Sequence, residues 1–295
     1  MSDQAILFIH ALTGLHPGGG TALGVIDLPI RRERHTNWPI VPGSSLKGVL
    51  RSEYNRRVGS KPDRNPVVLA LFGPPTGSSS EHAGALTLSD ARILAFPVRS
   101  LSGVFAWVTC PAVLERLQRD LSIAGGGPLP EIPRPDPNSA CCASSSPLVA
   151  GGKIILEEFE FSISEDGGEI SSWVADRVTA DTPSAKRICR HLAVLHDDDF
   201  THFVSNATEI VARIGLDYHL KTARPSALFY EEYLPSETLL YSLVICQDSH
   251  RAEFPIEGRE LLQKLESLKL SHVQIGGGET VGKGICAIRF FRATD

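Results

Sequence analysis

The residues with the clearest chemical potential lie between positions 15 and 35. His16 and Pro17 precede three glycines at 18–20, a single carboxylate follows at Asp27, and three arginines occur from 31 to 34. Glycine lets the backbone approach a bulky partner, and arginine binds phosphate through two parallel hydrogen bonds. A lone acid among phosphate-binding residues favours chemistry on a phosphodiester over binding alone.

The arginines begin a basic stretch in an acidic chain. Residues 30–57 hold seven Lys or Arg and two Glu, a local charge of +5, whereas the whole chain carries −5. This pattern predicts a nucleic-acid-binding stripe, with Arg31, Arg34 and Arg51 as candidate contacts. A solvated helix face is the alternative. The spacing predicts a helix over 44–54 with Ser44 or Ser45 as its N-cap.

Two later segments carry further candidates. Residues 277–284 resemble a phosphate-binding P-loop, but Gly284 replaces the Ser or Thr, and a strand is predicted where a helix should follow. They predict a glycine-rich hairpin whose Gly277, Gly278 and Lys283 pack on a phosphodiester backbone. In an extended segment at 227–235, Glu231 and Tyr233 share one face and could move protons or support a scissile phosphate. An amphipathic edge strand is the alternative for this segment.

The elements that must position these residues alternate between strands and helices. We predict strands at 5–12, 85–91, 104–109, 153–161, 239–246 and 285–291, and helices at 112–121, 185–195, from about 198, and at 258–268. Residues 125–152 are rich in Pro, Gly and Ser and are interpreted as a flexible loop. The order, with strands at both ends, fits an α+β fold of ferredoxin-like type enlarged by insertions.

Composition narrows the class of protein. The chain of 295 residues has six cysteines and no C-x-x-C pair, which favours reduced thiols and a cytoplasmic location. It contains no apolar run of about 18 residues, so no spanning helix is predicted.

Taken together, the segments resemble a known family. Residues 16–35, 43–48, 88–100, 230–235 and 275–284, in this order, are similar to the repeated backbone subunit of type III-B (Cmr) CRISPR effector complexes, of the RAMP superfamily. The resemblance implies one RAMP domain over 1–295, a modified RNA-recognition-type fold with a thumb at approximately 205–235. It implies that Asp27 is the catalytic aspartate, assisted by His16 and the Glu231–Tyr233 pair, although Tyr230 and Glu232 could take these roles.

The resemblance also implies partners and an activity. Lys47, with Ser44 and Ser45, matches the helix start that contacts guide phosphates. Copies of the chain would stack along a CRISPR RNA with other Cmr subunits, and each copy would act as an endoribonuclease on paired target RNA. Asp27 could hold a divalent ion such as Mg²⁺. A non-catalytic RNA-binding scaffold and a stand-alone processing RAMP nuclease are the alternatives.

Overall fold

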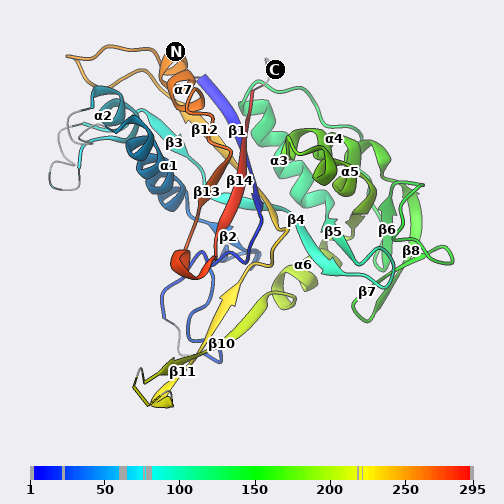
Figure 1. Ribbon diagram of the computed structural model, residues 1–295. Helices are drawn as coiled ribbons and strands as arrows, with labels where there is room; N and C mark the ends of the chain where they lie inside the picture. Colours follow the sequence, from blue (N-terminus) through cyan, green and yellow to red (C-terminus); the bar gives the residue numbers. More distant parts are fainter. Residues whose placement is uncertain are drawn as a thin grey trace.

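The computed structural model describes residues 3–21, 24–59, 65–75, 77, 82–217, 219–220 and 222–292. Its strands and helices form one mixed sheet, a separate hairpin and helices on both faces of the sheet (Figure 1). The strands are β1 (Asp3–Ala11), β2 (Ile40–Val41), β3 (Leu86–Leu88), β4 (Ala91–Arg99), β5 (Phe105–Thr109), β6 (Ser139–Cys142), β7 (Lys153–Leu156), β8 (Phe159–Asp166), β9 (Leu192–Leu195), β10 (Glu209–Leu216), β11 (Ala223–Tyr233), β12 (Leu239–Cys246), β13 (His272–Gln274) and β14 (Ile285–Phe291). The helices are α1 (Gly43–Val58), α2 (Pro66–Phe72), α3 (Pro111–Ile123), α4 (Gly168–Val178), α5 (Thr182–His191), α6 (Asp197–Asn206) and α7 (Gly258–Glu266), with a 3-10 turn η3 (Glu279–Val281).

The centre of the sheet has the ferredoxin-like strand order. Strands β14, β1, β12 and β4 lie side by side in that order, and each neighbouring pair is antiparallel. With α1 between β1 and β4 and α7 between β12 and β14, they give the βαββαβ sequence of that fold. The predicted α+β class is therefore confirmed.

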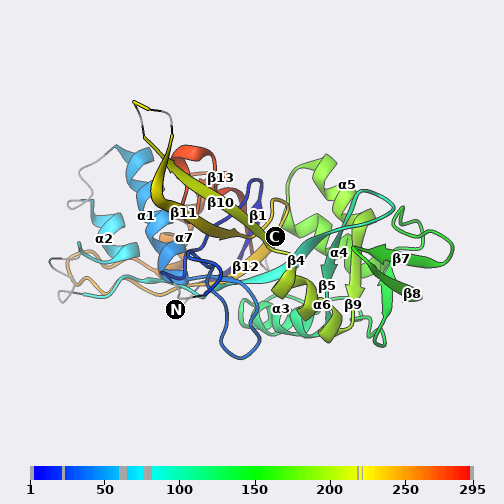
Figure 2. The same ribbon diagram turned by 90° about the horizontal axis from the view of Figure 1, so that it is seen from below.

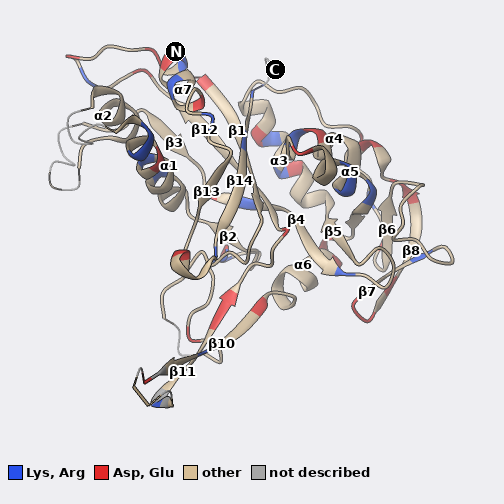
Figure 3. Ribbon diagram, viewed as in Figure 1, with Lys and Arg blue, Asp and Glu red and all other residues tan. Residues whose placement is uncertain are grey.

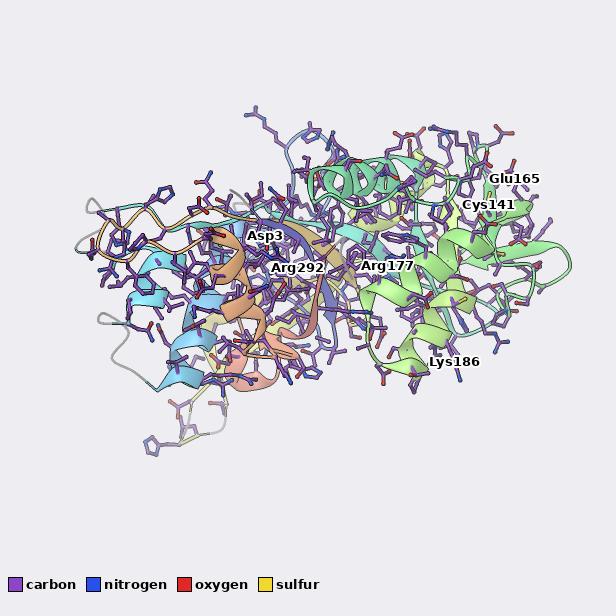
Figure 4. The ribbon with its side chains drawn as sticks, turned by 90° about the horizontal axis from the view of Figure 1, so that it is seen from above. Asp3, Cys141, Glu165, Arg177, Lys186 and Arg292 are labelled. Atoms are coloured by element: carbon purple, nitrogen blue, oxygen red, sulfur yellow. The ribbon has the colours of Figure 1, made fainter. Side chains whose placement is uncertain are left out.

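Helices cover both faces of this centre. In Figure 1, α1 and α7 lie on one side of β1 and β14, and α3 and α4 lie on the other. Accordingly, every residue of β1 from Ala5 to Ala11 is buried, as expected for a strand covered on both faces. At the far end of the chain, Arg292 forms an ion pair of 2.9 Å with Asp3, which fastens the end of β14 beside the start of β1 (Figure 4).

The sheet continues beyond β4 into a second set of strands that was only partly predicted. Strands β5, β9, β6, β8 and β7 extend it, with β9 parallel to β5 and β8 parallel to β6. The prediction of a flexible loop at 125–152 missed β6, which pairs with both β8 and β9. The helix predicted over 185–195 ends at His191, because Leu192–Leu195 is a fully buried strand beside β5. A short apolar run does not by itself distinguish a buried strand from a helix.

The two strands β10 and β11 form their own antiparallel sheet, which projects from the body (Figures 1 and 2). It lies within the range for which the resemblance implies a thumb, and that role stays a prediction. None of the helices in the described residues combines the length and apolar character needed to cross a membrane.

Candidate functional site

Strand β11 forms the floor of the site. Its alternation places Glu231 and Tyr233 on one face, and the Tyr233 hydroxyl donates a hydrogen bond of 2.5 Å to Glu231 Oε2. Glu232 points to the opposite face and is buried, with a relative exposure of 3%. The predicted sharing of faces is thus confirmed, and the pairs Glu231–Tyr233 and Tyr230–Glu232 have different surroundings.

His16 completes the Glu231 face. Its Nδ1 lies 2.7 Å from the Glu232 carbonyl oxygen, which can only accept, so Nδ1 carries a proton. Its Nε2 lies 3.9 Å from Glu231 Oε1, and its ring centre lies 5.5 Å from that of Tyr233. In the neutral ring, Nε2 is therefore the free acceptor beside a carboxylate.

Two cations flank the group formed by Glu231, Tyr233 and His16, and no pattern in the sequence indicated that they would lie together. Arg213, on β10, donates from Nη2 to the Tyr233 hydroxyl at 2.7 Å and from Nε to Glu231 Oε2 at 3.2 Å. Lys283 Nζ lies 4.7 Å from the centre of the Tyr233 ring. Burial raises the pKa of Tyr233, the bond to Glu231 raises it further, and Arg213 opposes them. Arg213 and Lys283 therefore place two positive charges at the face that carries Glu231 and Tyr233.

Arg213 was not predicted as a site residue, because its proximity to Glu231 depends on how two strands pair. Arg213 pairs with Phe229 in the hairpin, so it is the diagonal neighbour of Glu231 on the same face. Only the register of β10 against β11 reveals this relationship.

Asp27 reaches the site on a segment that extends the hairpin sheet. Leu28 forms a parallel bridge with Glu231, and Leu28 N–H donates to the Tyr230 carbonyl at 3.0 Å. The Asp27 side chain accepts a hydrogen bond of 2.7 Å from Tyr230 N–H through Oδ2. On the other side, Gly18 forms an antiparallel bridge with Ile30. The segment carrying Asp27 therefore lies between β11 and the glycines that follow His16.

The glycine-rich loop near the C-terminus contacts the backbone of His16. Strands β13 and β14 pair antiparallel on either side of the loop, so it is a hairpin, as predicted, and lacks the helix of a P-loop. Gly277 N–H donates to the His16 carbonyl at 3.0 Å. Gly276 has φ of 77°, and a Cβ on it would lie 2.3 Å from the same carbonyl oxygen. Glycine is thus required there for both conformation and space.

Lys and Arg positions are visible on α1 in Figure 3, but several cations of the basic stripe are engaged within the protein. Arg32 forms an ion pair of 2.6 Å with the buried Glu232, Arg56 pairs with Glu53, and Arg57 donates to a backbone carbonyl. Arg31 and Arg34 are exposed, and their side chains form no hydrogen bond or ion pair within the described ranges. Within the basic stripe, these two arginines are therefore free to contact an external phosphate.

The start of α1 differs from the prediction in its cap. The helix begins at Gly43, whose N–H is bound by Asp90 Oδ1 at 2.8 Å, and Pro42 occupies the N-cap without a side-chain bond. Ser44 and Ser45 are exposed in the first turn, so their hydroxyls face solvent and do not cap the helix.

The remaining predicted contacts of α1 are partly engaged. Lys47 Nζ donates to the Leu86 carbonyl at 2.7 Å, and burial lowers the pKa of Lys47, with Arg51 adding to the effect. Arg51 itself reaches the Pro74 carbonyl at 3.3 Å. Both lie on α1, whose first turn carries the exposed Ser44 and Ser45.

The donor set for a metal is sparse. The described residues contain no group of three or more His, Cys, Asp or Glu side chains arranged to hold a metal ion. Mg²⁺ commonly binds one or two carboxylates and takes its other ligands from phosphates and water. Asp27 fits such a site only as a single carboxylate.

The strand order of the central sheet and the helices on its faces define an α+β protein with a ferredoxin-like centre. The chain belongs to the RAMP superfamily, whose family model matches residues 8–287. Over 293 residues it is 41% identical to the CRISPR system Cmr endoribonuclease Cmr4 of Pyrococcus furiosus, covering 97% of this chain and 95% of that protein. The crystal structure of oligomeric Cmr4 from Pyrococcus furiosus superposes with a TM-score of 0.76 at 34% identity, covering 99% of this chain and 100% of that one. A chain of the type III-B Cmr-beta complex bound to cognate target RNA shares the fold, with a TM-score of 0.73 at 23% identity and coverage of 97% and 96%.

Proposed function

We propose that this chain is the repeated backbone subunit of a type III-B CRISPR effector complex. It binds CRISPR RNA, stacks with copies of itself and other Cmr subunits, and cuts paired target RNA at regular intervals. The observation that carries this proposal is the placement of Asp27, His16 and Glu231 on three neighbouring backbone segments, with Arg213 at Glu231 and Lys283 at Tyr233. The Cmr4 relative, 41% identical, bears the name endoribonuclease.

The chemistry follows from the available groups. RNA is cut when a 2′-oxygen attacks its own phosphorus and the 5′-oxygen leaves. A bond from phosphorus to O2′ forms as the bond to O5′ breaks, giving a 2′,3′-cyclic phosphate and a 5′-hydroxyl. The Asp27 carboxylate accepts the proton of the 2′-hydroxyl, and solvent protonates the departing oxygen. The cations stabilise the charge that develops on the phosphate.

His16 and Tyr233 act indirectly and do not contact the RNA. Their relative exposures are 8% and 0%, so they shape the site through Glu231 and the backbone of β11. Asp27 is then the one acid that reacts directly. Much of the acceleration of cleavage therefore comes from alignment of the RNA 2′-oxygen with its phosphorus. Asp27 would hold a divalent ion such as Mg²⁺ when one is bound, and that ion would neutralise phosphate charge.

Guide binding is assigned to a separate set of residues. Arg31 and Arg34 contact phosphates directly, and the exposed first turn of α1 supplies the Ser44 and Ser45 hydroxyls together with its positive dipole end. Lys47, Arg51, Gly277 and Gly278 complete this RNA-binding set. Stacked copies combine their cations along one RNA, which makes a net charge of −5 per chain tolerable.

We place the protein in the cytoplasm. All six cysteines are unpaired, which agrees with a reducing compartment.

A non-catalytic scaffold is the second candidate function. The observation that favours it is the bond from Tyr230 N–H to Asp27 Oδ2, because a carboxylate that anchors a loop has a structural role of its own. The two functions require different chemical properties of the Asp27 side chain. An anchor needs only an acceptor oxygen, whereas a general base needs a charged carboxylate.

Asp27→Asn separates these two requirements in the assembled complex, because asparagine retains an acceptor for Tyr230 N–H. The assay follows an end-labelled complementary RNA, with the wild-type complex, Asp27→Ala and Asp181→Asn in parallel. Asp181 accepts the Ser184 N–H in the same way at the start of α5, outside the three segments that form the site, and serves as the matched control.

We expect periodic cleavage by the wild type and by Asp181→Asn, and loss of cleavage with retained assembly in both Asp27 variants. Intact RNA with the wild type would establish the scaffold. Full cleavage by Asp27→Asn would show that Asp27 is not the general base. Cleavage of repeat RNA by the protein alone would favour the stand-alone processing nuclease.

A further inference from the structure

The Glu232 carboxylate is the most heavily bonded acid near the site, although it faces away from the Glu231 face. Its side chain is 4% exposed. It accepts hydrogen bonds from Ile30 N–H at 3.0 Å, from Arg32 Nη2 at 2.6 Å and from Thr208 Oγ1 at 2.8 Å. A buried carboxylate held by three donors is a fixed structural element, and its low exposure keeps it away from an external 2′-hydroxyl.

The backbone of Glu232 holds the other two segments of the site. Its N–H donates to the Leu28 carbonyl at 3.0 Å, and its carbonyl accepts from His16 Nδ1 at 2.7 Å. One residue therefore contacts both the segment that carries Asp27 and the side chain of His16.

Arg32 extends this anchor to a neighbouring helix. Besides Glu232, its Nη1 donates to the Val204 carbonyl in α6 and to the Asn37 carbonyl, both at 2.9 Å. Thr208 lies between α6 and β10, so the carboxylate connects the base of the hairpin with residues 28–32. Slippage of these residues along β11 would break the bonds to Ile30 and Arg32 together.

We propose that Glu232 is the positioning residue that sets the register of Asp27. It fixes residues 28–32 as a third strand on β11, and this register brings the Asp27 carboxylate to Tyr230 N–H. Arg32 is its partner and does not contact RNA, in contrast to Arg31 and Arg34. The inference rests on the proposed function, since it concerns the alignment of the catalytic carboxylate.

Glu232→Gln in the assembled complex tests this role. Glutamine keeps the volume and one acceptor oxygen, but it loses the charge opposite Arg32 and presents an NH₂ group to one of the three donors. A displacement of about 1 Å at a reacting group lowers rates by about 10²-fold. We expect the single-turnover cleavage rate at saturating complex to fall by about that factor, with an unchanged dissociation constant for target RNA.

Hydrogen exchange gives a readout independent of cleavage. Amides of residues 24–32 should exchange faster in Glu232→Gln, while those of the β1 and β12 core are unchanged. A purely structural role would instead lower the melting temperature and raise exchange throughout. Thr208→Ala, which removes one donor and leaves the ion pair, is the milder second variant and should give an intermediate rate.

Glu266→Gln provides the matched control, because Glu266 also accepts from an arginine, Arg292, at 2.8 Å but lies away from the site. Wild-type cleavage and wild-type exchange at 24–32 in Glu232→Gln would overturn the inference and leave the proposed function intact. A cleavage-inactive wild type would overturn the proposed function, and exchange at 24–32 would still decide whether Glu232 sets the register.

Discussion

Gly276→Ala is the substitution whose effect follows most directly from the geometry around His16. Gly276 has φ of 77°, and a Cβ at this position would lie 2.3 Å from the His16 carbonyl oxygen and 2.8 Å from its carbon. Both atoms belong to backbone that cannot rotate away. The loop must therefore separate from His16, which breaks the 3.0 Å bond from Gly277 N–H to that carbonyl.

The magnitude has two parts. A left-handed conformation at a residue with a Cβ destabilises by about 1–2 kcal/mol. Relief of the overlap by a backbone shift adds about 1–3 kcal/mol, as for other overpacked sites. We expect the free energy of unfolding to fall by about 2–5 kcal/mol in total. Displacement of His16 should also slow target cleavage.

Gly282→Ala isolates the first part. Gly282 has a nearly identical φ of 75°, but a Cβ there would meet nothing within 4 Å. Urea unfolding of both variants therefore measures the overlap as a difference, and single-turnover cleavage by assembled complexes measures its effect on the site. Equal destabilisation by the two substitutions would refute the contact between the loop and His16, and with it the argument that this loop supports the site.

Three further results are expected. In filter-binding titrations, Arg31→Ala and Arg34→Ala should each weaken RNA binding and reduce the slope of log K against log salt by about one. Arg57→Ala is the control and should leave the slope unchanged, because the Arg57 side chain donates to the Leu268 carbonyl. Burial raises the pKa of the Cys142 thiol to about 11, so at pH 8 it is almost entirely protonated and should be alkylated by iodoacetamide far more slowly than the more exposed Cys189, as followed by peptide mass spectrometry. Raising the pH toward 11 should increase the Cys142 rate about tenfold per unit, because the thiolate is the reactive form; a pH-independent rate would contradict the burial of this thiol.

Local patterns in the sequence were sufficient for the strands and helices that pack with ordinary periodicity. The helices predicted at 112–121 and from about 198 are present as α3 and α6, and they depend, like the alternation of β11, on interactions between near neighbours. The missed elements depended on distant partners. The strand Ser139–Cys142 is short and lies in a stretch rich in Pro, Gly and Ser, and it is stabilised by pairing with β8 and β9.

The sequence by itself determined which residue types were available for the site: an acid after glycines, a histidine, a Glu–Tyr pair and a late glycine loop. Only the tertiary structure decided how these groups divide their tasks. Glu231 and Glu232 are adjacent and chemically identical, yet one faces Arg213 and Tyr233 while the other is buried beneath Arg32 and Ile30. The physical reason is that strand alternation fixes only the opposite faces. The partners of the Glu232 side chain, Ile30 and Arg32, lie some 200 residues earlier in the chain, and no local pattern can encode such contacts.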